Sequence, residues 1–84
     1  MSANPPRYSL IDVETANMIG VYRSQRAALR DVASTIRQYG RDSIEVLSLS
    51  LARDDVPADQ GHIATGADLA ARAAAAFPDA VTAA

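Results

Sequence analysis

Arginines recur at helical spacing near the middle of the chain, and they are its clearest candidates for binding chemistry. Arg26, Arg30, Arg37 and Arg41 fall within a sector of roughly 60° if residues 24–40 form a helix with about 100° per residue. Arg23 extends this set, and we call the five residues the arginine stripe. Guanidinium groups in line can neutralise phosphates or bind carboxylates through paired hydrogen bonds. The stripe is therefore interpreted as a contact for a protein partner, a contact for nucleic acid, or an ordinary solvated face.

The charge balance of the chain weighs against nucleic acid. The protein has eight arginines, no lysine and ten acidic residues, so its net charge is −2. Residues 1–41 contain six arginines and three acids (+3), whereas residues 42–84 contain two arginines and seven acids (−5). These two halves can face each other within the fold, pair between subunits or bind separate partners.

The single histidine, His62, is the first candidate for acid–base or metal chemistry, because the unperturbed pKa of histidine lies near neutrality. Asp54, Asp55 and Asp59 precede it, so oxygen ligands and one imidazole would be available to a metal ion. Their spacing matches no calcium loop or zinc motif. A solvated acidic loop beside an edge-strand histidine is the simpler interpretation, and we predict neither a metal nor a cofactor.

Nucleophilic and carboxylate chemistry are not favoured either. Ser48 and Ser50 alternate with leucines as on a half-buried strand, without the glycines of a nucleophile elbow and without a cysteine or lysine in the chain. Asp12 and Glu14 lie just before a turn, where acidic residues usually shape the turn. The four glycines are scattered and form no phosphate-binding loop. We therefore predict that the protein is not an enzyme and has no catalytic residues.

Length and composition predict one small domain with a thin core. The chain has 84 residues, and 18 of its hydrophobic residues are alanines, which bury little area each. Thin cores are often completed by a second copy of the chain, so we expect a homo-oligomer, most simply a dimer. No leader sequence and no apolar run of membrane-spanning length are visible, and a soluble cytoplasmic bacterial protein is the expectation.

The stripe needs a helix to position it, and residues 24–40 predict one. Apolar residues recur at steps of three and four, with Ser24 as N-cap and Gly40 as the C-terminal stop. The buried stripe of this helix is predicted to consist of Leu29, Val32, Ala33, Ile36 and Tyr39.

A β-hairpin is predicted before this helix, with strands at 7–13 and 18–23. Tyr8 and Leu10 should face one side with Met18 and Tyr22, and the alternate positions of both strands are apolar as well. Asn17 is a candidate for positive φ at the turn, and Ala16 would be strained there. Two apolar faces exceed what two helices in so short a chain can cover, so one face should meet another subunit.

After Gly40 the sequence predicts a second hairpin and helix. Residues 41–46 suggest a helical turn capped by Asp42, with the start of the next strand as the alternative. Residues 47–52 suggest a strand, 53–61 a loop and 62–65 a fourth strand. Residues 67–77 are predicted to form the second helix, with a capping box from Thr65 to Asp68. One face of this helix should carry Leu69, Ala73, Ala76 and Phe77. Residues 1–6 should be a disordered lead, 7–77 a single α+β domain and 78–84 a frayed tail. The predicted fold is a two-layer sandwich in the order ββαββα, with about four antiparallel strands and both helices on one face.

The segment DVETANMIGVYRSQRAALRDV resembles a pattern of small uncharacterised bacterial proteins with the same ββαββα order. Its marks are "ET-small-N" at a hairpin turn, an "IG-x-Y" strand and a Ser- or Thr-capped helix with "AL-x-x-V". Together with LSLSLARDD and HIATGADLAARA, the resemblance covers roughly residues 8–72. Glycine is more usual in that group at the position of Ala16, and no activity, cofactor or catalytic residue comes with the resemblance.

The function best supported by the sequence is a small non-enzymatic interaction module that self-associates through an uncovered sheet face or edge. The first alternative is a nucleic-acid-binding or regulatory accessory protein that uses the arginine stripe. The second and least favoured alternative is a small enzyme or metal protein centred on His62.

Overall fold

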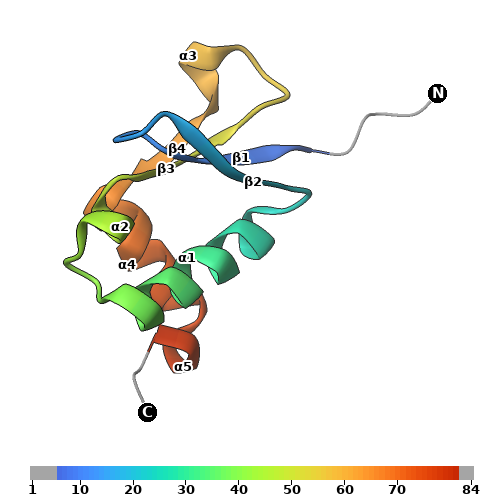
Figure 1. Cartoon of the computed structure of the whole chain (residues 1–84). Helices are drawn as coiled ribbons and strands as arrows, with labels where there is room; N and C mark the ends of the chain where they lie inside the picture. The colour runs from blue at the N-terminus through green and yellow to red at the C-terminus, as the bar shows by residue number, and fades with distance from the viewer. Residues whose placement is uncertain (1–5, 82–84) are drawn as a thin grey trace.

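A four-stranded antiparallel sheet with helices packed mainly on one face forms the fold of the protein (Figure 1). The structure is a computed structural model that describes residues 6–81. Its strands are β1 (Tyr8–Asp12), β2 (Asn17–Tyr22), β3 (Leu49–Arg53) and β4 (His62–Thr65), in the spatial order β2-β1-β3-β4. Its helices are α1 (Gln25–Tyr39), α2 (Ile44–Leu47), α3 (Ala58–Gly61), α4 (Gly66–Ala76) and α5 (Pro78–Val81). The predicted α+β class is confirmed, as is the ββαββα order of the strands and the two long helices.

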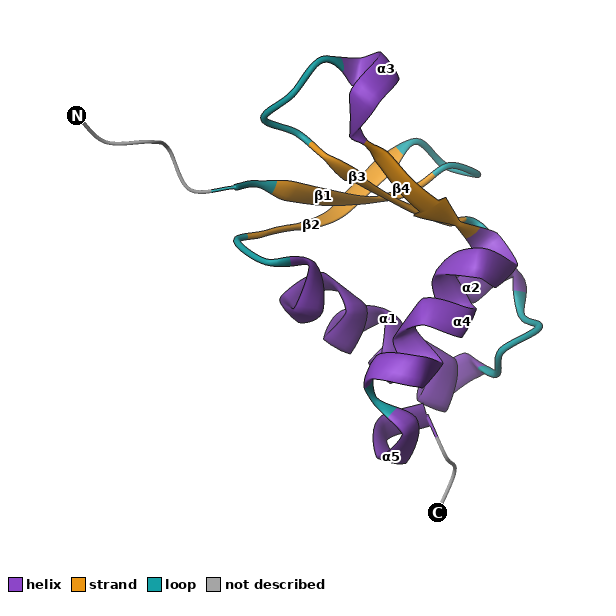
Figure 2. Ribbon diagram, turned by 180° about the vertical axis from the view of Figure 1, so that it is seen from behind, coloured by secondary structure: helices purple, strands orange, loops and turns teal. Residues whose placement is uncertain are grey.

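Two layers meet at a core made by one face of the sheet and the long helices. Figure 2 shows α1, α2, α4 and α5 on one side of the sheet, whereas α3 stands at the other side. The central strands supply Leu10 and Leu51 to this core, α1 supplies Val32, and α4 supplies Leu69, all almost completely buried. The opposite face of the sheet carries no long helix in the described part of the chain, and we call it the open face.

Helix α1 forms as its sequence predicts. The Ser24 side chain accepts a hydrogen bond from the Ala27 N–H at 3.1 Å, and Gly40 ends the helix with φ of +96°, a conformation that favours glycine. The buried residues are Ala28, Leu29, Val32, Ala33 and Ile36. Tyr39 was expected in this set but is 52% exposed, because it is the last helical residue and projects past the core.

Three four-residue helices occur where the sequence predicts a helical turn, a loop and a frayed tail. The turn expected at 41–46 is α2, which follows Ser43 rather than Asp42 and includes Leu47, a residue we expected in a strand. The expected loop at 53–61 ends in α3. The expected frayed tail begins with α5, whose Ala80 and Val81 pack against the core. The expected disordered lead, apart from residue 6, and residues 82–84 lie outside the described residues.

The capping box predicted at the start of α4 is not formed. Thr65 makes no side-chain hydrogen bond to the first turn of α4, because its hydroxyl is hydrogen-bonded to neighbours on the sheet. The helix begins instead at Gly66, whose φ of +60° suits a glycine between a strand and a helix. Ser48, which was expected on the polar outer side of a strand, is buried, and it lies in the sequence between α2 and β3.

The turn between β1 and β2 holds an alanine in the left-handed region. Ala16 has φ of +59°, and among residues 6–81 it is the one non-glycine residue with positive φ, so Asn17 does not take that role. The Asp12 carboxylate accepts a hydrogen bond from the Glu14 N–H at 2.9 Å, which helps to fix the turn. The turn therefore forms in spite of strain at one residue.

Relieving this strain should stabilise the protein. We expect Ala16→Gly to raise the free energy of unfolding by about 0.5 to 1 kcal/mol, because left-handed strain in alanine exceeds the extra chain entropy of glycine. Urea denaturation of the two proteins measures the difference. Ala71→Gly, an exposed position inside α4, is the matched control and should lower stability by about 1 kcal/mol. Equal loss of stability in both variants would contradict the assignment of strain to Ala16.

Candidate functional site

The open face consists of two rows of side chains that run across all four strands. One row is Val21, Ser9, Ala52 and His62, and the other is Met18, Ile11, Ser50 and Thr65, each read from β2 to β4. Residues directly opposite in neighbouring strands share a face. The open face is therefore apolar on the β1–β2 side and polar on the β3–β4 side.

A β-bulge in β2 places Met18 on this face. Leu10 pairs with Gly20, but the next residue, Ile11, pairs with Met18, so Ile19 is the extra residue of the bulge. The sequence predicted Met18 beside Tyr8 and Leu10, and this prediction is wrong because simple alternation ignores the bulge. Met18 instead lies opposite Ile11 and is 57% exposed.

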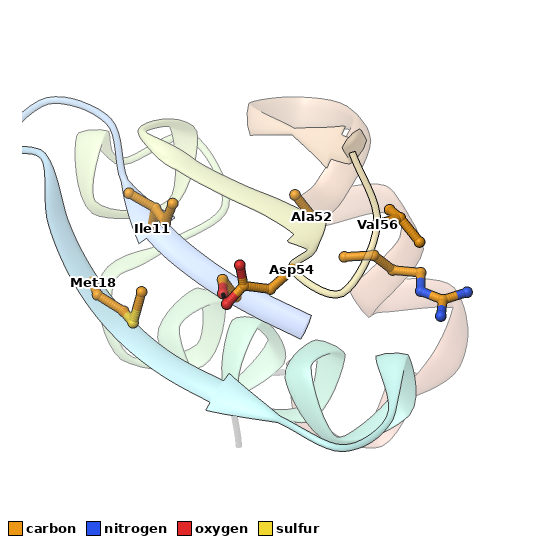
Figure 3. Close-up of a pocket in the computed structure, with 7 residues that line it drawn as sticks. Ile11, Met18, Ala52, Asp54 and Val56 are labelled. Atoms are coloured by element: carbon orange, nitrogen blue, oxygen red, sulfur yellow. Dashed lines mark hydrogen bonds between the residues drawn. The ribbon is translucent and has the colours of Figure 1, made fainter. Parts of the chain in front are cut away.

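The open face is hollowed into a groove of about 270 Å³ beside Met18 (Figure 3). The groove is lined by Ser9, Ile11, Met18, Ala52, Arg53, Asp54 and Val56. Figure 3 shows Met18 and Val56 on opposite sides of the groove with Asp54 between them. The groove thus combines apolar walls with one carboxylate.

The charge of Asp54 is compensated by its neighbours. Ser9 Oγ donates a hydrogen bond to Asp54 Oδ2 at 3.0 Å, and Arg7 Nε lies 3.1 Å from the same oxygen. The Asp54 N–H also donates to the carbonyl of Arg7 at 2.7 Å. These contacts attach the loop after β3 to the start of β1, so Asp54 acts as a brace for the groove wall.

The next aspartate, Asp55, is held by Arg53. Arg53 donates from Nε to Oδ1 at 3.0 Å and from Nη2 to Oδ2 at 2.5 Å, a two-point guanidinium–carboxylate contact. These hydrogen bonds lower the pKa of Asp55 to about 2. Asp54 and Asp55 are thus each in contact with an arginine. Within residues 6–81, no three histidine, cysteine, aspartate or glutamate residues are grouped closely enough to hold a metal ion.

His62 belongs to a short hydrogen-bonded chain on the polar side of the open face. His62 Nε2 lies 2.7 Å from Thr65 Oγ1, which in turn lies 2.9 Å from Ser50 Oγ. No sequence motif links these residues, and their proximity follows from the β3–β4 register. These hydrogen bonds orient three polar side chains, of which His62 and Thr65 are exposed, but they include no carboxylate that would orient the imidazole as in a catalytic triad.

The arginine stripe is divided by the structure. Arg26 and Arg30 lie over the ring of Phe77, with guanidinium carbons 4.5 and 5.6 Å from its centroid. Arg23 precedes α1, Arg37 lies in the last turn of α1, and Arg41 follows Gly40, all of them exposed. The ion pairs found among residues 6–81 involve Arg7, Arg53 and Arg72, so the described structure pairs no member of the stripe with a carboxylate.

The fold and its surfaces define a small α+β domain with one covered and one open sheet face. Comparisons with models of protein families, with curated proteins and with solved structures found no match to this chain. Along residues 6–81, no helix has both the length and the apolar character needed to cross a membrane. The argument for function therefore rests on the open face and on the arginine stripe.

Proposed function

We propose that the protein is a non-enzymatic interaction module that self-associates through the β1–β2 side of its open face and through the edge of β2. The observation that carries this proposal is the exposure of the hairpin. Its apolar side chains Val13, Met18, Ile19 and Val21 are each about half exposed. Contiguous apolar surface of this kind usually marks an interface, because a soluble monomer gains by covering it.

A second copy is the partner that this surface fits. Strand β2 lies at the edge of the sheet, so its outward N–H and C=O groups are available for pairing with another strand. Two β2 strands related by a two-fold axis between positions 19 and 20 would pair antiparallel, with Met18 opposite Val21 of the second copy. Residues 17–22 contain no charged side chain, so two identical strands approach without like-charge repulsion.

The bulge at Ile19 is expected to limit this association to a closed dimer. A bulge twists an edge strand and disfavours the long flat pairing that leads to aggregation. The opposite edge, β4, is short and polar and offers His62 and Thr65 rather than an apolar row. An interface of standard size removes roughly 800 Å² from each partner. The chain exposes 5321 Å², so one such patch per copy is a modest share of its surface.

The polar side of the open face supports a binding role over a catalytic one. Ser50, Thr65 and His62 form a relay of hydroxyl and imidazole groups, but the relay has no acidic partner and lies in solvent rather than in a closed site. General acid–base catalysis depends on a positioned group in a site that orients the substrate.

Sedimentation equilibrium tests self-association directly. We expect the wild-type chain to sediment as a dimer at micromolar concentration. Val21→Lys should weaken the dimer by about 100-fold, because two-fold symmetry places a lysine on both sides of the interface. Val21 is 48% exposed, so a lysine there leaves the monomer folded.

Ile44→Lys is the matched control for this experiment. Ile44 is also β-branched and is 57% exposed, but it lies on α2 on the helical side of the sheet. This variant should dimerise as the wild type does. A mass of one chain for the wild type at all concentrations, or equal dissociation of both lysine variants, would refute the proposal.

A further inference from the structure

Two arginines of α1 and one aromatic ring form a cationic cluster that the self-association of the hairpin does not use. Arg26 and Arg30 are one helical turn apart, and Phe77 is the residue that follows α4. Both guanidinium carbons lie within 5.6 Å of the centroid of the same ring. We propose that the Arg26–Arg30 pair, held by Phe77, binds the dianionic phosphate group of a small ligand.

The ring keeps the two guanidinium groups in place while leaving their hydrogen-bond donors available. A guanidinium plane over an aromatic ring is attracted by the negative face of the ring, and this contact uses none of the N–H groups. Phe77 is itself partly buried and packs against the core, so it is a fixed support rather than a loose side chain. Side chains that are already ordered lose less entropy when they bind a ligand.

The positive charge of this pair is not neutralised within the described chain. The acidic residues nearest to the pair in the sequence either contact other groups or make no ion pair with Arg26 or Arg30. Asp31, next to Arg30, accepts a hydrogen bond from the Tyr22 hydroxyl at 2.5 Å. The ion pairs found among residues 6–81 leave out both Arg26 and Arg30. Two cations beside the same ring repel each other, and a bound anion would relieve that repulsion.

The position of Arg26 at the start of α1 adds to this positive field. Arg26 is in the first turn of a 15-residue helix, and this turn contains no acidic residue. The N-terminal end of a helix carries a partial positive charge from its unpaired N–H groups. The helix end and the two guanidinium groups therefore favour the same kind of ligand.

A phosphate group matches this pair better than a carboxylate does. A phosphate monoester carries a charge of about −1.5 to −2 near pH 7, which two guanidinium groups can balance, and its three terminal oxygens can accept from both. A single carboxylate balances one arginine only. Asp79, two residues after Phe77, is the remaining acid near the ring in sequence, and its charge would oppose phosphate binding.

The experiment is an NMR titration of the full chain, labelled with ¹⁵N, with inorganic phosphate and separately with O-phospho-L-serine at pH 7. The Nε–H signals of Arg26 and Arg30 should shift and saturate with both ligands. Comparison of the two affinities then shows whether the pair prefers free phosphate or an esterified phosphate group. Sodium acetate is the carboxylate probe and should bind at least about tenfold more weakly.

Four variants test the assignment to this pair. Arg26→Gln should weaken phosphate binding by about tenfold, since one charge-assisted contact is removed. Arg37→Gln removes the same charge from the same helix at a position without the ring, and it should change the affinity by less than about twofold. Arg26→Lys keeps the charge but loses the planar fork and should weaken binding several-fold. Asp79→Asn should strengthen binding.

The proposal is overturned if no Nε–H signal saturates, if acetate binds as tightly as phosphate, or if Arg37→Gln weakens binding as much as Arg26→Gln. The last result would mean that the ligand senses only the general field of α1. A single-stranded oligonucleotide provides a further arm. Tight binding of it that depends equally on Arg26, Arg37 and Arg41 would replace the small-ligand site with a nucleic-acid surface.

Discussion

Leu51→Ala is expected to lower the free energy of unfolding by about 3 kcal/mol and the Tm by more than about 10 °C. Leu51 lies on β3, between β1 and β4, and is 0% exposed. It is paired with Leu10 on one side and Ala64 on the other, both of them buried. Truncation to alanine would leave a cavity at the centre of the core-facing side of the sheet.

The size of this effect follows from how few large residues the core contains. The largest fully buried side chains among residues 6–81 are Leu10, Leu51, Leu69, Val32 and Val46. The rest of the buried core includes five alanines, which have no side-chain volume to move into a cavity. A chain of this length has a total stability of about 5 kcal/mol, so the loss is a large fraction of the whole.

Leu47→Ala is the matched control, because it makes the same substitution at a leucine that is 39% exposed in α2. We expect it to cost about 1 kcal/mol, since part of the truncated side chain already contacts water. Urea denaturation monitored by circular dichroism measures both variants. Similar losses for Leu47 and Leu51 would contradict the assignment of the core to the inner face of β3.

The sequence predicted those elements whose signals are local. Helix α1 has its apolar period, its N-cap at Ser24 and its stop at Gly40 within 17 residues, so its limits follow from local chemistry. The fourth strand and the second long helix were also predicted close to their observed limits, the helix from an apolar face on an alanine-rich run. The antiparallel sheet then followed from two short hairpins, each of them followed by a helix.

Helices α3 and α5 were not predicted because four residues carry no periodicity, whereas α2 was expected as a helical turn with an earlier start. Helix α5 begins at Pro78, the first residue of the expected frayed tail, and proline is suited to the first turn of a helix. Helix α2 takes Leu47 out of an alternation that fitted a strand. Tertiary contacts decide such segments, as the packing of Ala80 and Val81 on the core shows.

The candidate sites depend on contacts between residues that are far apart in the sequence, and local sequence patterns do not predict such contacts. The open face differs from the predicted one because the β-bulge in β2 places Met18 opposite Ile11. The partner of Arg26 and Arg30 is Phe77, 47 residues beyond Arg30, and nothing in the local pattern of either segment connects them. The arginine stripe could thus be recognised from helical spacing, but its division into ring-bound and unpaired members could not.

Gly61→Ala is expected to destabilise the protein by about 2 to 3 kcal/mol, and the sign of this effect is the informative part. Gly61 is buried at the end of α3 and has no positive φ, so backbone propensity alone would favour alanine at this position by up to about 1 kcal/mol. A Cβ atom on Gly61 would instead lie well inside 3.0 Å of the backbone carbonyl oxygen of Arg53 and close to Val56. A backbone oxygen in a sheet strand cannot rotate away as a flexible side chain can.

Relief of this overlap would require α3 to move from the end of β3, and that movement would disturb the Arg53–Asp55 contact and the wall of the groove at Val56. Thermal denaturation of Gly61→Ala and of Gln60→Ala separates steric overlap at Gly61 from a general effect of alanine in α3. Gln60 is the exposed neighbour on the same short helix and should tolerate alanine with little change in stability. We also expect the pKa of Asp55 to rise from about 2 in Gly61→Ala, since its hydrogen bonds from Arg53 would lengthen. A Gly61→Ala variant more stable than the wild type would show that α3 has room to move away from β3, and that close packing does not require glycine there.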